Sequence, residues 1–464
     1  MGFWKLNQSH DAIAAIDART GQTWTYAQLR ADAQLMQDAL PQPGRRTLGL
    51  LLAHNRYECL AGYVAALNAD CALILVDAGL NAELTQSLLA TYRPDWIFTR
   101  DGEFDGYRAG PVPGLLVGPE PQDGEIHPDL ALMLSTSGST GSPKLVRLTL
   151  ANLAANADSI ARYLSLTADD RPITSLPMPY SYGLSVINSH LSVGAAIVLS
   201  EDGVLRREFW DAVDRYGCTS FAGVPYTYQL LLQTGLLSKK GASLKTLTQA
   251  GGRLEEHFIE QMLKLSGERG WRFFVMYGQT EATARIAYMP HERLREKTGS
   301  VGVAIPRGTL STDEATGELI YSGPNVMMGY AECRADLAKG DELHGILRTG
   351  DLARQDAEGF FYINGRLRRF LKLFGKRFNL DDVEKVLSRH YEGGLACYGW
   401  DDLLMVALEQ CADTTAPTNL VCHLFNLPRT AVKVVSVTTL PRTANGKMDY
   451  QRLTEAAQEH TARP

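Results

Sequence analysis

Residues 134–144 read Leu-Ser-Thr-Ser-Gly-Ser-Thr-Gly-Ser-Pro-Lys, and the apolar run from Leu130 to Leu134 leads into them. This pattern predicts a buried strand that ends in a flexible, hydroxyl-rich turn. Small residues let backbone N–H groups approach a polyanion closely, and Lys144 adds a charge suited to phosphate. The stretch does not match G-x-x-x-x-G-K-[ST], so it is not a P-loop. Taken alone, it is either a phosphate-binding loop or a Ser/Gly-rich linker.

The composition is that of a globular protein with no strong charge bias. The 464 residues allow two or three domains, and 45% apolar with 21% charged residues is ordinary for such a protein. A net charge of −6 argues against broad nucleic-acid binding. Any anionic ligand of the Ser/Gly-rich turn must therefore be met by local donors.

Cysteine usage and apolar patterning favour a cytoplasmic protein. The seven cysteines form no CxxC pair and have no zinc-ligand spacing, so we expect reduced thiols. The N-terminal residues lack the apolar segment of a signal peptide, and no apolar run reaches the length of a membrane span. We therefore expect no membrane insertion.

Strand-length apolar segments alternate with amphipathic helical segments in the first 200 residues. The predicted strands cover Thr47 to Leu52, Ala72 to Val76, the surroundings of Ile97, Ile173 to Leu176 and Ala195 to Leu199. The predicted helices cover Tyr57 to Leu67, Ala82 to Tyr92, Leu150 to Tyr163 and Leu184 to Leu191. This alternation predicts an α/β fold in layers, with mostly parallel sheets.

From about Gly317 the pattern changes to short strands separated by Gly and Asp turns. These strands cover Glu318 to Tyr321, Gly345 to Arg348, Leu352 to Arg354 and Phe360 to Ile363. They predict an antiparallel, barrel-like subdomain at about 300–366. A basic segment and a small mixed region follow. We therefore expect an N-terminal region of layered α/β subdomains plus a barrel over 1–366, and a small α+β domain over 367–464.

Four further segments give the Ser/Gly-rich turn a specific meaning. They are Met-Tyr-Gly-Gln-Thr-Glu-Ala-Thr at 276–283, Arg-Thr-Gly-Asp at 348–351, Gly-Phe-Phe-Tyr-Ile-Asn-Gly-Arg at 359–366 and Pro-Arg-Thr-Ala-Asn-Gly-Lys at 441–447. In this order, the five segments resemble the acyl-adenylating superfamily of acyl-CoA synthetases, carrier-protein ligases, peptide-synthetase adenylation domains and luciferases. The resemblance covers nearly the whole chain.

The resemblance implies an AMP-forming acid–thiol ligase that uses ATP and Mg²⁺. A carboxylate would attack the α-phosphorus of ATP and expel pyrophosphate, and a thiol would then displace AMP to give a thioester. Two anions must meet in the first step, so such a site needs donors and cations directed at the α-phosphate.

The resemblance assigns most of the matched residues to ATP. The β- and γ-phosphates would be held by Thr136, Ser137, Gly138, Ser139, Thr140, Gly141 and Lys144. The adenine and its surroundings would be lined by Gly251, Gly252, Tyr277, Gly278 and Tyr362. Asp351 would accept hydrogen bonds from the ribose hydroxyls. Arg366 would contact the ribose and a phosphate.

Three residues would act on the reacting groups. Thr280 resembles the α-phosphate hydroxyl of the family, Glu281 its magnesium ligand, and Lys447 the lysine that bridges the substrate carboxylate and the phosphate. Simpler interpretations also exist: helix capping for Thr280 and Glu281, and a surface lysine in an Asn-Gly turn for Lys447. Core packing is the alternative for Tyr277 and Tyr362, and an ordinary turn is the alternative for the glycine pair.

The expected substrate is a small carboxylic acid with an uncharged tail, and not an α-amino acid. Tyr180 stands where acyl-CoA synthetases often have a gating histidine, and Gly183 stands where amino-acid-activating relatives have an aspartate. No acidic residue lies between Pro177 and Leu199, and a buried ammonium without a carboxylate is costly. The lining would include the aromatic residues Tyr180, Tyr182 and Tyr226, as well as Gly183.

The C-terminal domain would be a mobile lid that turns about Arg368, where many relatives have an acidic residue. Residues 372–378 would line the thiol tunnel or form a solvated basic hairpin. We favour coenzyme A as the thiol; the alternative is the phosphopantetheine arm of a carrier protein, whose acidic surface would suit the basic residues around Arg368. A luciferase-like oxygenase and a non-catalytic nucleotide-binding relative are the remaining alternatives.

Overall fold

The structure is a computed structural model, and it describes residues 2–42, 44–118, 124–135, 144–366, 370–391, 393–441, 450 and 452–454. The described residues form two compact units. The larger unit is built from segments within residues 1–365, and the smaller unit mainly from residues from 366 onward.

The first large sheet of the larger unit has eight strands in the order β18-β9-β8-β4-β3-β5-β7-β6. The strands are β3 (Thr47–Ala53), β4 (Cys71–Asp77), β5 (Trp96–Phe98), β6 (Arg108–Ala109), β7 (Leu115–Val117), β8 (Leu130–Ser135), β9 (Leu145–Thr149) and β18 (Gly329–Ala331). Its central strands β8, β4, β3 and β5 run parallel, and the outer pairs are antiparallel. Every residue of β3 is buried, as expected for a parallel strand covered on both faces.

The second large sheet has five strands in the order β11-β12-β13-β14-β15. They are β11 (Ser220–Gly223), β12 (Thr246–Gln249), β13 (Arg272–Tyr277), β14 (Ala287–Tyr288) and β15 (Val303–Ala304). The first three strands are parallel, with Gly223, Gln249 and Val275 in register. A small sheet joins β10 (Ile197–Leu199) to two strands from the start of the chain, β1 (Ile13–Asp17) and β2 (Thr23–Thr25).

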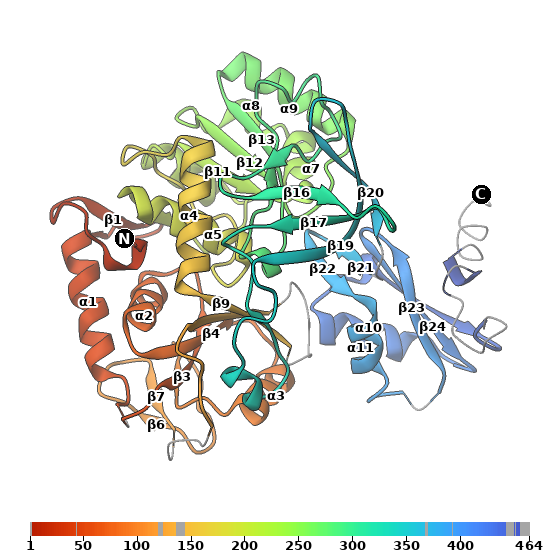
Figure 1. Cartoon of the computed structure of the whole chain (residues 1–464), viewed down its shortest axis with the longest axis horizontal. Helices are drawn as coiled ribbons and strands as arrows, with labels where there is room; N and C mark the ends of the chain where they lie inside the picture. Colours follow the sequence, from red (N-terminus) through yellow and green to blue (C-terminus); the bar gives the residue numbers. More distant parts are fainter. Residues whose placement is uncertain are drawn as a thin grey trace. The chain divides into compact units, whose positions relative to one another are not determined.

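Helices connect the strands of these sheets. They are α1 (Tyr26–Ala39), α2 (Tyr57–Asn68), α3 (Ala82–Tyr92), α4 (Leu150–Leu164), α5 (Ser181–Val193), α6 (Arg207–Arg215), α7 (Pro225–Thr234), α8 (Leu236–Lys239) and α9 (Glu256–Arg269), with short 3₁₀ turns η1 (Phe3–Lys5), η2 (Thr280–Ala282) and η3 (Arg334–Ala338). Helices α4 and α5 run alongside each other in Figure 1 and contact along their length. Both have polar or small residues buried among their apolar ones.

The last part of the larger unit is antiparallel. It has β16 (Thr309–Thr312), β17 (Glu318–Ser322), β19 (Ile346–Gln355) and β20 (Phe361–Arg366), in the order β16-β17-β19-β20. The smaller unit has a two-stranded hairpin, β21 (Phe370–Leu373) and β22 (Lys376–Asn379), and a sheet of β23 (Leu395–Trp400), β24 (Leu403–Glu409) and β25 (Val432–Val437). Its helices are α10 (Leu380–Leu387) and α11 (Thr415–Phe425), with η4 (Arg429–Ala431) before β25. The layered α/β fold expected from the sequence is confirmed.

Two local expectations need correction. The strand expected at Ile173 to Leu176 is reduced to isolated bridges at Pro172 and Ile173. The two strands expected around Arg348 and Leu352 are one continuous strand, β19, whose register against β17 shifts at this point. The Thr-Gly-Asp sequence at 349–351 is therefore a bulge inside a strand and not a turn between two strands, because Gly350 adopts a φ of +73° there.

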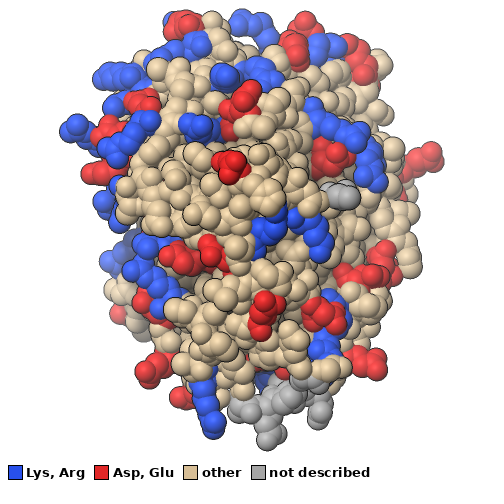
Figure 2. Space-filling view, turned by 90° about the vertical axis from the view of Figure 1, so that its left-hand side faces the viewer, with Lys and Arg blue, Asp and Glu red and all other residues tan. Residues whose placement is uncertain are grey.

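The surface carries both signs of charge. On the face shown in Figure 2, basic and acidic side chains are interspersed, with no broad basic patch. All seven cysteines lie in the described part of the chain, and none of them forms a disulfide. Among the described residues, none of the helices has the length and apolar character that crossing a membrane requires.

The start of α4 generates a prediction about stability. Thr149 Oγ1 accepts a hydrogen bond from the Asn152 amide at 3.0 Å, and Asn152 Oδ1 accepts one from the Thr149 amide at 2.8 Å. Thr149→Ala removes the first bond and should lower the free energy of unfolding by about 1 kcal/mol. Thr149→Ser keeps the hydroxyl and should retain most of this stability. Chemical denaturation followed by circular dichroism measures both, and equal losses in the two variants would contradict the capping role.

Candidate active site

Three parallel strands of the second large sheet end at one edge, and turns that contain glycine follow β12 and β13. Gln249 ends β12 and Tyr277 ends β13. Gly251, after β12, has a φ of +85°, and the carbonyl of Gly252 accepts a hydrogen bond from Gln249 Nε2 at 2.9 Å. Ligands of open α/β sheets bind at the carboxyl ends of parallel strands, so this edge is the natural place for a site.

The turn after β13, residues 278–285, is unusually tight. A Cβ on Gly278 would lie 1.9 Å from the carbonyl oxygen of Ala284, so only glycine allows the two backbone segments to pack this closely. Thr283 has φ +64° and ψ −53°, and the Ala284 amide donates to the Ala282 carbonyl at 2.6 Å. This is a γ-turn, which is a strained conformation for a β-branched residue. Strain of this kind persists only where the surroundings hold it, and it is frequent at functional sites.

Asn325 holds the 278–285 turn in place. Its Nδ2 donates to the carbonyls of Ala282 and Arg285, both at 2.8 Å, and its Oδ1 accepts from the Tyr321 hydroxyl at 2.7 Å. Its own carbonyl accepts from Thr283 Oγ1 at 2.8 Å. The side chain is buried, and its hydrogen bonds fix the first residue of the γ-turn and the residue that follows its last one.

Tyr277 and Asp351 meet although 74 positions separate them. The Tyr277 hydroxyl donates to Asp351 Oδ2 at 2.5 Å, and Asp351 is 1% exposed. The bulge in β19 directs Asp351, since Gly350 donates to Glu318 Oε1 at 2.9 Å and the Asp351 amide donates to Thr349 Oγ1 at 3.1 Å. The structure thus joins two of the segments that the sequence singled out.

Glu281 and Lys144 are connected through Tyr330. The Tyr330 hydroxyl donates to Glu281 Oε1 at 2.8 Å, and Lys144 Nζ lies 3.9 Å from the centre of the Tyr330 ring. Lys144 Nζ also lies 3.8 Å from Glu332 Oε1. A predicted phosphate ligand and a predicted metal ligand are therefore held on the two sides of one tyrosine.

Thr280 connects the turn to helix α5. Its Oγ1 lies 3.2 Å from Ser181 Oγ, and both groups are buried. The neighbouring Tyr182 is buried, and its hydroxyl donates to the Thr248 carbonyl at 2.8 Å. The rings of Tyr180 and Tyr182 are 6.2 Å apart in an edge-to-face arrangement.

Other predicted residues have different surroundings. A Cβ on Gly183 would lie 2.2 Å from the Pro177 carbonyl, so this position has no room for a substrate-binding side chain. The absence of an aspartate there therefore says nothing about the charge of the substrate. Tyr226, in the first turn of α7, is 38% exposed. The ring of Tyr362 lies under the guanidinium of Arg354 at 4.1 Å. Arg366 is the last residue of β20.

Several predicted residues lie outside the described part of the chain. They are Thr136, Ser137, Gly138, Ser139, Thr140 and Gly141 of the Ser/Gly-rich turn, Arg368 of the expected hinge, and Lys447. Residues 372–378, for which a tunnel wall and a basic hairpin were the alternatives, form most of the β21-β22 hairpin.

A magnesium ion is compatible with Glu281. Within the described residues, no group of three or more His, Cys, Asp or Glu side chains could hold a metal ion. Mg²⁺ in nucleotide sites commonly takes one or two carboxylates and completes its shell with phosphates and water. A single buried carboxylate beside a bound triphosphate therefore fits that ion.

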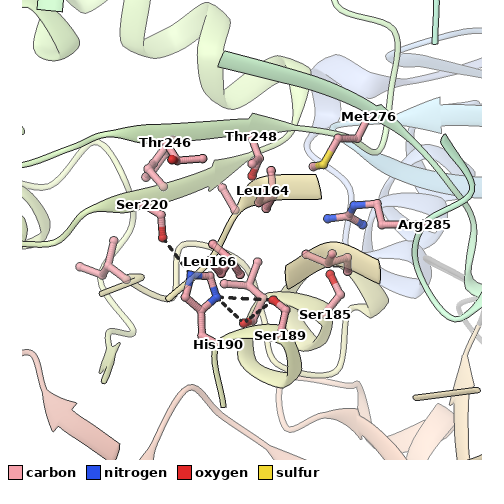
Figure 3. Close-up of a pocket in the computed structure, with 15 residues that line it drawn as sticks. Leu164, Leu166, Ser185, Ser189, His190, Ser220, Thr246, Thr248, Met276 and Arg285 are labelled. Atoms are coloured by element: carbon pink, nitrogen blue, oxygen red, sulfur yellow. Dashed lines mark hydrogen bonds between the residues drawn. The ribbon is translucent and has the colours of Figure 1, made fainter. Parts of the chain in front are cut away.

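A small cavity of about 20 Å³ lies beneath this edge, between α4, α5 and strands β11 to β13. His190 lies at one end of it in Figure 3. Its Nδ1 hydrogen-bonds the Val186 carbonyl at 2.8 Å, and its Nε2 lies 3.3 Å from Ser220 Oγ. Burial lowers the pKa of His190 to about 4, against smaller raising effects of the Val186 carbonyl and Asp170. The imidazole is therefore neutral at neutral pH.

Sequence reasoning missed Asn325, Tyr330, Ser181 and Arg285. Asn325 and Tyr330 lie far along the chain from the residues they hold, so no local pattern points to them. Arg285 gave one signal, because it is a lone charge in the otherwise uncharged stretch 282–291.

Comparison with known proteins places the chain among nucleotide-using enzymes. A model of the family described as "AMP-binding enzyme" matches residues 3–331. The indoleacetate–CoA ligase of Aromatoleum aromaticum is 27% identical over 91% of this chain and 91% of its own length. The L-proline–[L-prolyl-carrier protein] ligase of Pseudomonas fluorescens is 28% identical over 85% of this chain and 80% of its own length.

A solved structure shares the fold. A variant of the o-succinylbenzoate CoA synthetase of Bacillus subtilis, bound with a product analogue, aligns over 98% of both chains with a TM-score of 0.80 and 24% sequence identity. At this identity the likeness concerns the fold alone.

The hydrogen bonds of Asn325 predict a large effect on stability. Asn325→Leu removes three buried hydrogen bonds, those to the carbonyls of Ala282 and Arg285 and that from the Tyr321 hydroxyl, so we expect a loss of about 3 kcal/mol in the free energy of unfolding. Tyr321→Phe removes one bond of the three and should cost about 1 kcal/mol. Urea denaturation measures both variants. Equal stability of Asn325→Leu and the unsubstituted protein would show that the amide does not hold the turn.

Burial of His190 predicts a dependence of stability on pH. The folded state keeps the imidazole neutral down to about pH 4, whereas the unfolded chain protonates it near pH 6.5. The unfolded state binds more protons between these values, so stability is full above pH 6.5 and falls as the pH drops towards 4. The shift corresponds to about 3 kcal/mol.

The test compares variants at pH 7.5 and pH 4.5. His190→Gln should show a smaller loss of unfolding free energy between the two values, and His10→Gln, at an exposed position, should behave like the unsubstituted protein. An unchanged pH dependence in His190→Gln would contradict the assignment.

Proposed function

The chain belongs to the family of AMP-binding enzymes and is an acyl-CoA synthetase-like ligase, and we propose that it activates a small carboxylic acid with ATP and transfers the acyl group to coenzyme A. In the first step a carboxylate oxygen bonds to the α-phosphorus, and the bond to the β-phosphate breaks, which releases pyrophosphate. In the second step the thiolate sulfur bonds to the carbonyl carbon, and AMP leaves.

The observation that carries this proposal is the buried hydrogen bond between Tyr277 and Asp351 at 2.5 Å. It brings the aromatic residue after β13 beside a carboxylate from the β19 bulge, at the edge where Gly251 and Gly252 also lie. Asp351 would accept from the ribose hydroxyls, and Tyr277 and the two glycine backbones would line the adenine. Tyr362 and Arg366 would complete the nucleotide site.

The residues of the 278–285 turn would act on the phosphates. Thr280 Oγ1 would donate to the α-phosphate, and Gly278 would allow close approach of the backbone. Glu281 would hold Mg²⁺, which when bound neutralises phosphate charge and polarises the α-phosphorus. Lys144, with the Ser/Gly-rich turn before it, would hold the phosphates that leave as pyrophosphate. Lys447 would bring the carboxylate and the α-phosphate together.

The acid would enter between Tyr180 and Tyr182 and the sheet edge. Burial raises the pKa of each of these two tyrosines to about 12, and the opposing effect of Arg285 is smaller. They remain neutral hydrogen-bonding groups at neutral pH. A pocket that contains Arg285 and no described carboxylate lining residue disfavours an ammonium, so an α-amino acid is not the expected substrate.

A carrier protein is the second candidate for the thiol acceptor. The relative from Pseudomonas fluorescens, whose name specifies a carrier protein, supports this alternative. In either case we propose that the region 367–464 moves as a lid about Arg368 between the two steps. Seven cysteines without a disulfide among them support a reducing compartment such as the cytoplasm.

The function is tested by measuring pyrophosphate release with ATP, Mg²⁺ and a panel of carboxylic acids, with and without coenzyme A. We expect acid-dependent release of pyrophosphate and, with coenzyme A, an acyl-CoA product. AMP formation that requires a phosphopantetheinylated carrier protein would favour the second candidate. No release with any acid would contradict acid activation.

Lys447 provides the sharpest prediction about activity. Lys447→Ala should lower ATP–pyrophosphate exchange by roughly 10²- to 10³-fold, the scale of one lost preorganised electrostatic contact. Lys239→Ala removes an exposed lysine at the end of α8 and should leave the exchange unchanged. Full exchange activity in Lys447→Ala would remove this residue from the mechanism.

A further inference from the structure

Arg285 is a buried cation whose charge has no counter-ion among the described residues. It is 3% exposed, and no described carboxylate lies within 4.0 Å of its guanidinium, whereas many other described arginines have such a partner. Its Nη1 lies 3.4 Å from the Ala284 carbonyl, and its Nε has no hydrogen-bond partner in the described part of the chain. A buried charge of this kind is costly unless something pairs with it.

The neighbours of Arg285 hold it without neutralising it. Its guanidinium lies over the ring of Tyr182, 4.0 Å from the ring centre. Burial raises the pKa values of Tyr163, Tyr180 and Tyr182 well above neutrality, and it lowers that of His190 to about 4. These groups are all neutral at pH 7. Arg285 is therefore the one charged group among the described residues that line the cavity.

The guanidinium is directed into this cavity. Figure 3 shows it pointing towards Leu164, with Ser185 below it. The cavity measures about 20 Å³, which is room for about one water-sized group. The hydroxyl groups of Ser185 and Thr248 also line the cavity, but they are hydrogen-bonded to Tyr182, so Arg285 is its main donor. An oxyanion would satisfy the fork of donors on Arg285 better than a water molecule, because it also cancels the charge.

The cavity is connected to the proposed reaction site through α5. Thr280 contacts Ser181, and Arg285 contacts Tyr182, which is the next residue in the first turn of that helix. An acid whose reacting carboxylate lies at Thr280 would thus have Arg285 a short distance away along its chain. The reacting carboxylate must face the α-phosphate, and it loses its charge when the acyl-adenylate forms. It is therefore not the anion that neutralises Arg285.

We propose that Arg285 binds a second anionic group, a carboxylate or a sulfonate, on a small acid whose first carboxylate is activated. This inference rests on the proposed function and names its substrate class. It changes the expectation of an uncharged tail that the sequence alone suggested. Arg285 would donate two parallel N–H bonds to the second oxyanion and would repel an acid that carries an ammonium group.

The test measures kcat/KM for acid-dependent ATP–pyrophosphate exchange with paired acids of two to six carbons. Each pair has a terminal carboxylate or sulfonate in one member and a methyl group in the other. We expect the anionic member of the best pair to be preferred by at least about 100-fold, the scale of a satisfied charged contact. A comparison of the carboxylate pairs with the sulfonate pairs identifies which oxyanion the cavity accepts.

Variants at position 285 assign the preference to this residue. Arg285→Gln should reduce the ratio towards 1, mainly through KM, and Arg285→Lys should retain part of it because the charge remains without the planar fork. Arg207→Gln, which removes an exposed arginine in α6, should leave the ratio unchanged. Robust exchange with a preference for the methyl-terminated acids would overturn the proposal and leave acid activation intact. No exchange with any acid would overturn both.

Thermal unfolding separates binding from a structural role. Because a buried cation without a counter-ion is costly, Arg285→Met should melt at the same temperature as the unsubstituted protein or higher. The best anionic acid should raise the melting temperature of the unsubstituted protein and not that of Arg285→Met. A lower melting temperature for Arg285→Met, together with an unchanged acid preference, would show that Arg285 only packs against Tyr182.

Discussion

The close packing of Gly278 against the backbone of Ala284 is the constraint on which the candidate site depends. It folds residues 278–285 back on themselves and forces Thr283 into a γ-turn. The conformation costs about 1–3 kcal/mol, and the buried amide of Asn325 offsets it. As a result Thr280, Glu281 and Arg285 leave one short turn in three directions: towards α5, towards Tyr330 and into the cavity.

The two carboxylates beside this turn are buried and have hydrogen-bond partners. The Tyr277–Asp351 pair and the Tyr330–Glu281 pair are hydrogen-bonded at 2.5 and 2.8 Å. Arg285 is different, because its charge has no described counter-ion. The two hydrogen-bonded pairs hold the site in place. The charge of Arg285, which has no counter-ion among the described residues, marks where an anionic ligand is needed. The 278–285 turn would therefore contact both substrates: the phosphates of ATP through Thr280 and Glu281, and the tail of the acid through Arg285.

The sequence predicted elements well where periodicity was strong and local. The helix expected at Ala82 to Tyr92 has these bounds in α3, and the helix from Leu150 ends one residue beyond its expected end. The segment from Ile173 failed as a strand because it makes only single bridges to its neighbours. The strands around Arg348 and Leu352 merged because a bulge, set by the positive φ of Gly350, carries one strand past the Thr-Gly-Asp sequence.

For the site, sequence motifs pointed to residues but not to their contacts. Thr280, Glu281 and Asp351 were chosen from short patterns, and the structure joins Asp351 to Tyr277 and Glu281 to Tyr330. Asn325 and Arg285 could not be found in this way, because their importance arises from burial and from partners distant in the chain. Gly183 shows the opposite case. The sequence suggested that the lack of an aspartate there excludes an ammonium on the substrate, but the backbone leaves no space for any side chain at this position.

The central claim is that a carboxylate oxygen attacks the α-phosphorus of ATP at this turn. An isotope experiment tests it most directly: the preferred acid, labelled with ¹⁸O in both carboxylate oxygens, is incubated with ATP, Mg²⁺ and the thiol acceptor, and the products are analysed by mass spectrometry. The mechanism predicts AMP that carries one ¹⁸O atom, with unlabelled pyrophosphate. Unlabelled AMP, or ¹⁸O in inorganic phosphate, would contradict it.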